Sequence, residues 1–361
     1  MQLPLLLVTF GVIWQLLARH GPAIAFCEAG VGLSISMQNF VATAAVWLML
    51  GTFCLAQAPT FTVLPWNAHR AAVSLTFDDA RPVHLDLVVP ELNKRGMHAT
   101  FFVIVSKLTR IDDWRRVMEQ GHEIGNHSIS HEHAATLTKE SEETQVEDAK
   151  AFLDSNFHAN VTTFAYPYSE TSKGLAFWVK RYNFVARGWR GDGELPYLTP
   201  STDFDWYNLP SQPSFTKYDF AVYQDWTDKV MVMGAWTTFQ IHGIGEPASG
   251  FEPIPTATFL KLLDYLATQE RSGLWVAPFG EVAAYLRAQK IVEAVPPKTR
   301  GSEKIVAWEA PKSFPEGLVL KVTVAKRKTR LYQAGRQLHP DKKGIYSVSF
   351  DARKLVLKEA L

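Results

Sequence analysis

The chain has 361 residues, which is enough for one large domain and a smaller one. Its 37 basic and 36 acidic residues nearly cancel, and a net charge of +1 gives no sign of a polyanionic partner such as nucleic acid. The two cysteines, Cys27 and Cys54, lie in an apolar N-terminal region, so a chain that has lost this region can have neither a cysteine nucleophile nor a thiolate metal site.

The first 58 residues contain two hydrophobic runs, at 3–17 and 41–55. The second run follows Met37 and ends in Ala56-Gln57-Ala58, which has the small-x-small form of a signal-peptidase site. We therefore predict a signal peptide over 37–58 and export of the mature chain to the periplasm, the cell envelope or the extracellular space. Residues 37–40 carry no Lys or Arg, so the alternative is a retained membrane anchor with the protein facing outward.

Between about 71 and 290, short apolar runs alternate with amphipathic stretches, as in successive βα units. The expected strands are 71–77, 98–103, 123–126, 163–165, 184–187, 235–241 and 274–277, and the expected helices are 83–94, 112–120, 138–156, 172–181, 255–269 and 279–289. Seven strands with interleaved helices favour an α/β fold, a (β/α) barrel somewhat short of the eight-fold form, over 59–294. The stretch 188–229, rich in Pro, Gly, Asp and aromatic residues, is expected to be a long functional loop.

Residues 295–361 contain only strand-like runs, at 304–308, 318–324, 329–332, 346–350 and 355–357. The pattern predicts a small all-β appendage at the C-terminus. Its basic run Lys326-Arg327-Lys328, with Arg330, could contact an acidic wall polymer. The favoured interpretation is that these charges protect an edge strand from aggregation.

The strand expected at 71–77 ends in two adjacent carboxylates, Asp78 and Asp79. In a barrel of parallel strands this places both acids at the C-terminal rim, where active sites are built. Adjacent residues point in different directions, so one carboxylate could bind a metal while the other takes a proton from water. The alternative is a turn or a helix N-cap.

Histidines follow two other expected strands. His127 and His131 are four residues apart, so on a helical turn both imidazoles would lie on one face and could share a metal; a coincidence of surface residues is the alternative. Two histidines with one aspartate suit Zn²⁺ with open positions for water and substrate. His242 ends the strand at 235–241, where a satisfied core histidine is the alternative. Ionisable groups at three strand ends favour catalysis over packing.

Over roughly 71–287 the sequence resembles the polysaccharide deacetylases, carbohydrate esterase family 4. The resemblance implies a distorted (β/α)7 barrel and a divalent metal, most often zinc. The segments that carry it are 76–79, 127–131, 166–168 and 239–242.

The resemblance also implies a role for each motif residue. Asp78 corresponds to the general base, and Asp79, His127 and His131 correspond to the metal ligands. Tyr166-Pro167-Tyr168 resembles the motif in which the backbone N–H of the tyrosine, here Tyr168, helps to form an oxyanion hole. His242 corresponds to the general acid.

Three positions depart from the family pattern. Ala80 replaces a glycine, which is tolerable if the backbone there does not need a positive φ. Ala165 stands where many members have an arginine that steadies the base, so Arg187 or Arg190 must orient Asp78 instead. The fourth motif survives only as Asp205-Trp206, which we expect to tune His242 and to form a wall of the substrate cleft.

The expected function is metal-dependent hydrolysis of acetyl groups from an N-acetylated polysaccharide or oligosaccharide, without a covalent intermediate. This makes the protein a hydrolase of carbon–nitrogen bonds other than peptide bonds. No nucleic-acid partner is expected. A contact with the membrane is expected only if the N-terminal segment is retained. The alternatives are an O-acetyl polysaccharide esterase and a catalytically silent carbohydrate-binding protein. Retention of all five catalytic and metal-binding residues argues against the silent form.

Overall fold

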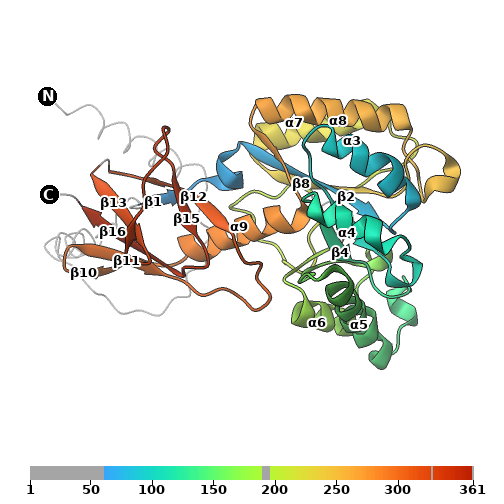
Figure 1. Ribbon diagram of the computed structural model, residues 1–361, viewed down its shortest axis with the longest axis horizontal. Coiled ribbons are helices and arrows are strands. Elements are labelled where there is room, and N and C mark those ends of the chain that lie inside the picture. The colour runs from blue at the N-terminus through green and yellow to red at the C-terminus, as the bar shows by residue number, and fades with distance from the viewer. Residues whose placement is uncertain (1–60, 189–195, 327, 360–361) are drawn as a thin grey trace, which may run out of the picture. The chain divides into compact units, whose positions relative to one another are not determined.

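The computed structural model describes residues 61–188, 196–326 and 328–359 (Figure 1). The expected signal segment, both cysteines, Arg190 and Arg327 lie outside these ranges. Within the described ranges, no helix combines the length and the apolar character that crossing a membrane requires.

A parallel sheet forms the centre of the larger domain. Its strands are β2 (Ala71–Asp78), β3 (Thr100–Val103), β4 (Glu123–Asn126), β5 (Thr163–Ala165), β6 (Val185–Arg187), β7 (Gln212–Pro213), β8 (Trp236–Ile241) and β9 (Leu274–Val276). The order is β6-β5-β4-β3-β2-β8-β7, with β9 paired to the start of β2, and every pairing is parallel. The sheet curls into the distorted (β/α)7 barrel that the sequence predicts. Strand β2 lies inside this order and is buried at all eight positions. Its C-terminal end therefore lies between those of β3 and β8 on the C-terminal rim of the barrel.

The helices follow the strands and pack around the sheet (Figure 1). They are α3 (Val89–Asn93), preceded by a π-helical turn (His84–Val88), α4 (Ile111–Glu119), α5 (Lys139–Phe157), α6 (Lys173–Tyr182), α7 (Phe220–Met233), α8 (Thr256–Arg271) and α9 (Phe279–Glu293). Helix α7 begins inside the stretch 188–229, which was expected to be a loop, and runs past its end. Its boundary signals were present: the Asp219 side chain caps the first turn at Ala221 N, and Gly234 ends the helix at a φ of +62°.

Helix α9 begins without a capping side chain of its own, because Pro278 stands at its N-cap. Thr100 and Glu123 from the barrel supply the missing acceptors. Thr100 Oγ1 accepts from Phe279 N at 2.8 Å, and Glu123 Oε2 accepts from Gly280 N at 2.9 Å. A carboxylate at a helix N-terminus also interacts favourably with the helix dipole. This contact fixes α9 to the end of the barrel opposite the rim of Asp78.

The C-terminal appendage is all-β, as predicted, and consists of two antiparallel sheets. One has the order β1-β12-β15 (Phe61–Val63, Val319–Val324, Tyr346–Ser349), and the other β10-β11-β16-β13-β14 (Lys298–Arg300, Glu303–Ala307, Lys354–Glu359, Thr329–Gln333, Arg336–Gln337). Strand β1 precedes the barrel in the chain yet pairs with β12. A single hydrophobic cluster contains residues of both sheets together with the buried face of α9.

Candidate metal and active site

The two carboxylates diverge because the backbone turns sharply at the end of β2. Asp79 has a φ of +77° and Ala80 a φ of +54°, both in the left-handed region. The glycine of the family pattern would adopt this conformation freely, whereas a residue with a Cβ costs roughly 1–2 kcal/mol there. The backbone at this position does need a positive φ, so Ala80 is not a neutral replacement for the glycine.

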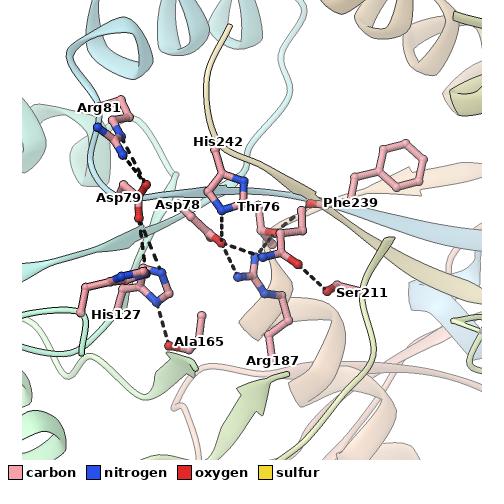
Figure 2. A network of polar contacts seen from close by, with 12 residues as sticks. Thr76, Asp78, Asp79, Arg81, His127, Ala165, Arg187, Ser211, Phe239 and His242 are labelled. Carbon is pink, nitrogen blue, oxygen red and sulfur yellow. Dashed lines mark hydrogen bonds and ion pairs between the residues drawn. The ribbon is translucent and has the colours of Figure 1, made fainter. Parts of the chain in front are cut away.

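Asp79, His127 and His131 converge on one point. Asp79 Oδ1 lies 3.8 Å from Nε2 of each histidine, and the three ligand atoms lie within 4.8 Å of one another. Asp79 Oδ1 is buried and has no hydrogen-bond partner among the described residues. His127 Nδ1 donates to the Ala165 carbonyl at 2.8 Å, which leaves the lone pair on Nε2 facing Asp79 (Figure 2). A divalent cation would satisfy all three atoms, so the residues fit a metal.

The histidines meet through a loop, so the expected helical turn at 127–131 is wrong. The backbone reverses at Ser128 and His131, whose φ values are +69° and +60°. Ser128 Oγ accepts from His131 N at 2.9 Å, and Gln145 Oε1 accepts from two further loop amides. Side-chain acceptors replace helical hydrogen bonds here and fix the loop that carries both ligands.

Both imidazoles are suited to metal binding because they are uncharged at neutral pH. Burial lowers the pKa of His127. Burial, with the neighbouring His127 and Lys107, lowers the pKa of His131 to about 4. Neutral imidazole is the form that coordinates metals.

Arg81 binds the other oxygen of the metal-site aspartate. Its Nη2 lies 2.7 Å from Asp79 Oδ2, and its Nε lies 3.2 Å from the same atom (Figure 2). With Oδ2 engaged in this way, only Oδ1 faces the histidines. The sequence analysis did not single out Arg81.

Asp78 is fully buried and held by an arginine from another strand. Arg187 Nη2 donates to Asp78 Oδ2 at 2.5 Å, and Gln240 Nε2 donates to the same oxygen at 3.2 Å (Figure 2). Burial alone would raise the pKa of Asp78, but the adjacent Arg187 guanidinium, with smaller effects of His127 and His242 when these are protonated, outweighs burial and holds the pKa well below its ordinary value. Asp78 Oδ1 is buried without a hydrogen-bond partner among the described residues.

Arg187 replaces the arginine that is missing at Ala165. The two residues are direct partners in the parallel pairing of β5 with β6, so the guanidinium enters the site from the neighbouring strand. Its Nη1 also donates to Thr76 Oγ1 at 2.6 Å. Of the two arginines proposed from the sequence, Arg187 contacts Asp78, and Arg190 lies outside the described residues.

His242 follows β8 and faces Asp78. Its Nε2 lies 3.6 Å from Asp78 Oδ2, and its ring packs against Phe251 at a centroid distance of 5.3 Å. The His242 carbonyl accepts a hydrogen bond from Nε2 of the buried His84 at 2.6 Å. Burial lowers the pKa of His84 to about 4, so this histidine is a neutral donor that ties the end of β8 to the turn after β2.

These groups open into one cavity of about 630 Å³. Its walls include Tyr168, Phe215 and Phe251, together with Lys107 and Arg81. Tyr168 is 52% exposed and stacks on His133 at a centroid distance of 3.7 Å. Exposed aromatic faces beside a polar centre suit a sugar ring. Pro167 is buried behind Tyr168 and begins the turn that presents it.

Asp205 and Trp206 do not reach this cavity. Trp206 packs against Phe204 at a centroid distance of 4.8 Å, and its carbonyl accepts from Ala186 N. Asp205 Oδ1 accepts from Tyr207 N at 3.0 Å, within its own turn. The expectation that this pair tunes His242 and walls the cleft is therefore wrong: the segment runs beside β6 and packs on its outer side.

A second cavity, of about 740 Å³, lies near the start of α9. Its buried carboxylate, Glu123, accepts from Thr100, Thr163 and Gly280, so its hydrogen-bonding capacity is used structurally. None of the motif residues lines it. The chemistry therefore belongs to the smaller cavity at the rim.

Comparison with known proteins agrees with this geometry. A family model for polysaccharide deacetylases matches residues 67–186. A gellan lyase from a Bacillus species is 25% identical over 236 residues, which are 59% of this chain and 9% of that protein. A peptidoglycan-N-acetylglucosamine deacetylase from Bacillus cereus is 26% identical over 130 residues, covering 36% of this chain and 46% of the relative. The chain thus spans less than half the length of either relative.

One solved structure, described as a polysaccharide deacetylase from Mycobacterium smegmatis, has the same fold. It matches with a TM-score of 0.52 at 16% identity and covers 63% of this chain and 94% of that one.

Proposed function

Because the chain belongs to the polysaccharide deacetylase family, we propose that it uses a bound divalent metal to hydrolyse acetyl groups from an N-acetylated polysaccharide or oligosaccharide. The observation that carries the proposal is the buried Asp79–His127–His131 cluster, with the arginine-held carboxylate of Asp78 beside it. The Bacillus cereus relative is named for an N-acetylated substrate.

Asp79, His127 and His131 would hold the metal, and their donor set of one carboxylate and two imidazoles suits Zn²⁺. When bound, the metal supplies Lewis-acid polarisation of the acetyl carbonyl and a more acidic water. Arg81 engages Asp79 Oδ2, so the carboxylate offers the metal a single oxygen and leaves coordination positions open.

Asp78 is the general base in this proposal. Arg187 and Gln240 both bind its Oδ2, which leaves Oδ1 as the buried acceptor for the proton of the attacking water. The guanidinium also keeps the carboxylate ionised, so the base is ready at neutral pH.

The remaining steps use Tyr168 and His242. The backbone N–H of Tyr168 is the proposed donor to the developing oxyanion, a contact typically worth about 3 kcal/mol in barrier height. His242 protonates the departing amine. The substrate is bound by the aromatic walls of the cavity, and hydrolysis proceeds without a covalent enzyme intermediate.

An acetate-release assay tests the proposed function. The mature protein should release acetate from N-acetylated substrates such as chitin oligomers, peptidoglycan or poly-N-acetylglucosamine, and chelation should abolish release until Zn²⁺ is restored. Acetylxylan provides the O-acetyl comparison. Release from acetylxylan alone would identify an O-acetyl esterase. Release from neither class, with the metal bound, would identify a binding protein.

We also propose that the enzyme is exported, with a mature chain from about Ala58. The support is the signal-peptide pattern at 37–58. Mass spectrometry of the exported protein should find its N-terminus near Ala58. An intact N-terminus in the membrane fraction would instead support the anchored form.

A further inference from the structure

The C-terminal β region carries a strong positive charge that the total for the chain conceals. Residues 298–361 contain 15 Lys and Arg against six Asp and Glu, a net charge of +9. The 297 residues before them contain 22 against 30, a net charge of −8. The near-zero total is therefore made of two opposed parts. The β region alone has the charge expected of a module that binds polyanions.

Strand register collects much of this charge on the outward face of the five-stranded sheet. Directly opposed residues in antiparallel strands point to the same face. One row across four strands is Arg300–Glu303–Lys358–Arg330, and the next is Lys298–Ile305–Val356–Tyr332. Lys354 lies on the same face of β16. We call Lys298, Arg300, Arg330, Lys354 and Lys358, with Tyr332, the cationic face. The opposite side of the sheet carries the buried core residues Leu331, Leu355 and Leu357.

One acidic side chain lies among these five cations. Lys358 pairs with Glu303 at 2.7 Å and lies over the ring of Tyr332 at 4.9 Å. The pKa of Glu303 is lowered by Lys358 and, to a smaller extent, by Arg300 and Lys354, so all three cations act on this one carboxylate. Within the described part of the chain, the other four cations form no ion pair. The face therefore keeps a net charge of about four for a ligand.

Protection of an edge strand does not explain this arrangement. Edge protection places charges on the outermost strands, here β10 and β14. Lys354 and Lys358 instead lie on β16, the central strand of the sheet. Arg330 and Lys358 are direct cross-strand partners, and like charges in that position destabilise a sheet. Edge protection therefore does not account for the two lysines of the central strand or for Arg330 beside Lys358, which points to a role in binding.

We propose that the cationic face binds an acidic polysaccharide. The cations lie on three strands, β10, β16 and β13. Neighbouring strands in a sheet are about 5 Å apart, and about 13 Å separates Lys354 from Lys358 along β16. Charges spread in this way suit an extended polymer with repeated carboxylates better than one small anion. Tyr332, on β13 beside Lys358, offers a sugar ring an aromatic surface. The face would hold an acidic glycan independently of deacetylation.

Binding of the full mature protein to polygalacturonate tests this proposal. Polygalacturonate is acidic and has no acetyl group, so the assay is independent of the proposed catalytic function, and dextran is the neutral control. We expect binding to polygalacturonate that weakens steeply with salt, and none to dextran. The variant Arg300→Gln/Arg330→Gln/Lys354→Gln should raise the Kd by about tenfold or more at low salt and flatten its salt dependence.

The matched control removes three charges from elsewhere in the same region: Lys312→Gln/Lys342→Gln/Lys343→Gln. It should change the Kd by less than about twofold if binding is specific to the cationic face. All six positions are exposed, so both variants should keep the thermal unfolding temperature of the parent protein. Equal losses in both variants, or binding to dextran, would overturn the proposal. Tighter binding to DNA than to polygalacturonate at equal salt would overturn the assigned class of partner.

Discussion

In the proposed mechanism, the guanidinium of Arg187 determines which oxygen of Asp78 can accept a proton. It is 1% exposed and holds Oδ2, while Oδ1 remains the buried acceptor. A base fixed in this way needs no reorganisation before it takes a proton. The same contact balances the cost of burying a carboxylate among apolar strands.

Substitution of Arg187 should therefore reduce turnover more than metal binding. Arg187→Met leaves Asp78 buried without its charged partner, so we expect kcat to fall by about 10²-fold or more and stability to fall by about 3–5 kcal/mol. Arg187→Lys keeps the charge but loses the forked geometry, so its losses of kcat and of stability should be smaller than those of Arg187→Met. Acetate release, zinc content and urea unfolding measure the three effects. Arg110→Met, which removes an exposed pair with Asp86 and Asp113, is the control and should change none.

The two adjacent aspartates should respond differently to the same substitution. Asp78→Asn should keep its zinc and lose turnover by roughly 10²–10⁴-fold, the usual contribution of positioned acid–base catalysis. Asp79→Asn should lose zinc, because it removes the anionic ligand. Metal analysis of the two purified variants separates the roles. A zinc-free Asp78→Asn protein would reverse the assignment.

His242 should matter most when the leaving group is poor. An amide must have its amine protonated to depart, whereas an activated acetate ester needs little help. We expect His242→Ala to reduce hydrolysis of an N-acetyl sugar oligomer much more than hydrolysis of an aryl acetate. Equal losses on both substrates would show that His242 does not protonate the amine.

At this scale the sequence located candidate residues that single segments carry, and it missed contacts that depend on the pairing of strands far apart in the chain. Asp78, Asp79 and His242 were identified because each follows an apolar strand. Gln240 contacts Asp78 because β8 pairs with β2 in a register that sets Thr76 beside Gln240. No local pattern reveals such a register.

Among the elements, α9 depends on a cap from a distant strand. Burial raises the pKa of Glu123 above its ordinary value of 4.5, although its hydrogen bonds oppose this. The folded state then binds the proton more tightly than the unfolded state. The contribution of Glu123 to stability is therefore largest below about pH 4.5 and decreases as the pH rises through the folded pKa.

Two substitutions of Glu123 should separate its cap from its charge. Glu123→Ala leaves two threonine hydroxyls and one helix amide without their acceptor and should cost about 2–4 kcal/mol of unfolding free energy. Glu123→Gln keeps an acceptor for Gly280 N and should cost less. It should also remove the part of the pH dependence above pH 4.5 that Glu123 causes. Urea unfolding at several pH values measures both. A pH dependence unchanged in Glu123→Gln would assign it to other groups.

Some element boundaries could be predicted from short apolar runs. For β4 and β5, the expected and observed residues coincide. The loop at 127–131 was misjudged because i,i+4 spacing also arises from a reversed backbone held by side chains. Helix α7 was missed because aromatic, Pro and Gly residues dominate the stretch before it.

For the whole molecule, the total charge concealed how the charge is distributed along the chain. The net charge of +1 averages a basic β region with an acidic remainder, so it gave no sign of a polyanionic partner. Strand β1 could not be predicted either, because a three-residue strand has no measurable periodicity and its partner lies at the other end of the sequence.

Strand β1 should stabilise the C-terminal sheets. Val63 is fully buried in the hydrophobic cluster shared by the two β-sheets and α9, whereas Thr62 is exposed. Val63→Asp buries an unpaired charge and should strongly increase the proteolysis of residues 298–359 under native conditions. Thr62→Asp, on the outer side of the same strand, should leave the digestion rate near that of the parent. Equal resistance in both proteins would show that the sheet is stable without β1.

The pairing of β1 with β12 also dictates an order of assembly. Val63 is synthesised about 260 residues before Val322, its partner, so the two strands can pair only after the intervening chain has been made. Until β12 has been made, Phe61 and Val63 lack the surface that buries them. A nascent chain therefore cannot complete β1 before residues 319–324 have been made, and a premature stop ahead of β12 leaves β1 without its partner strand.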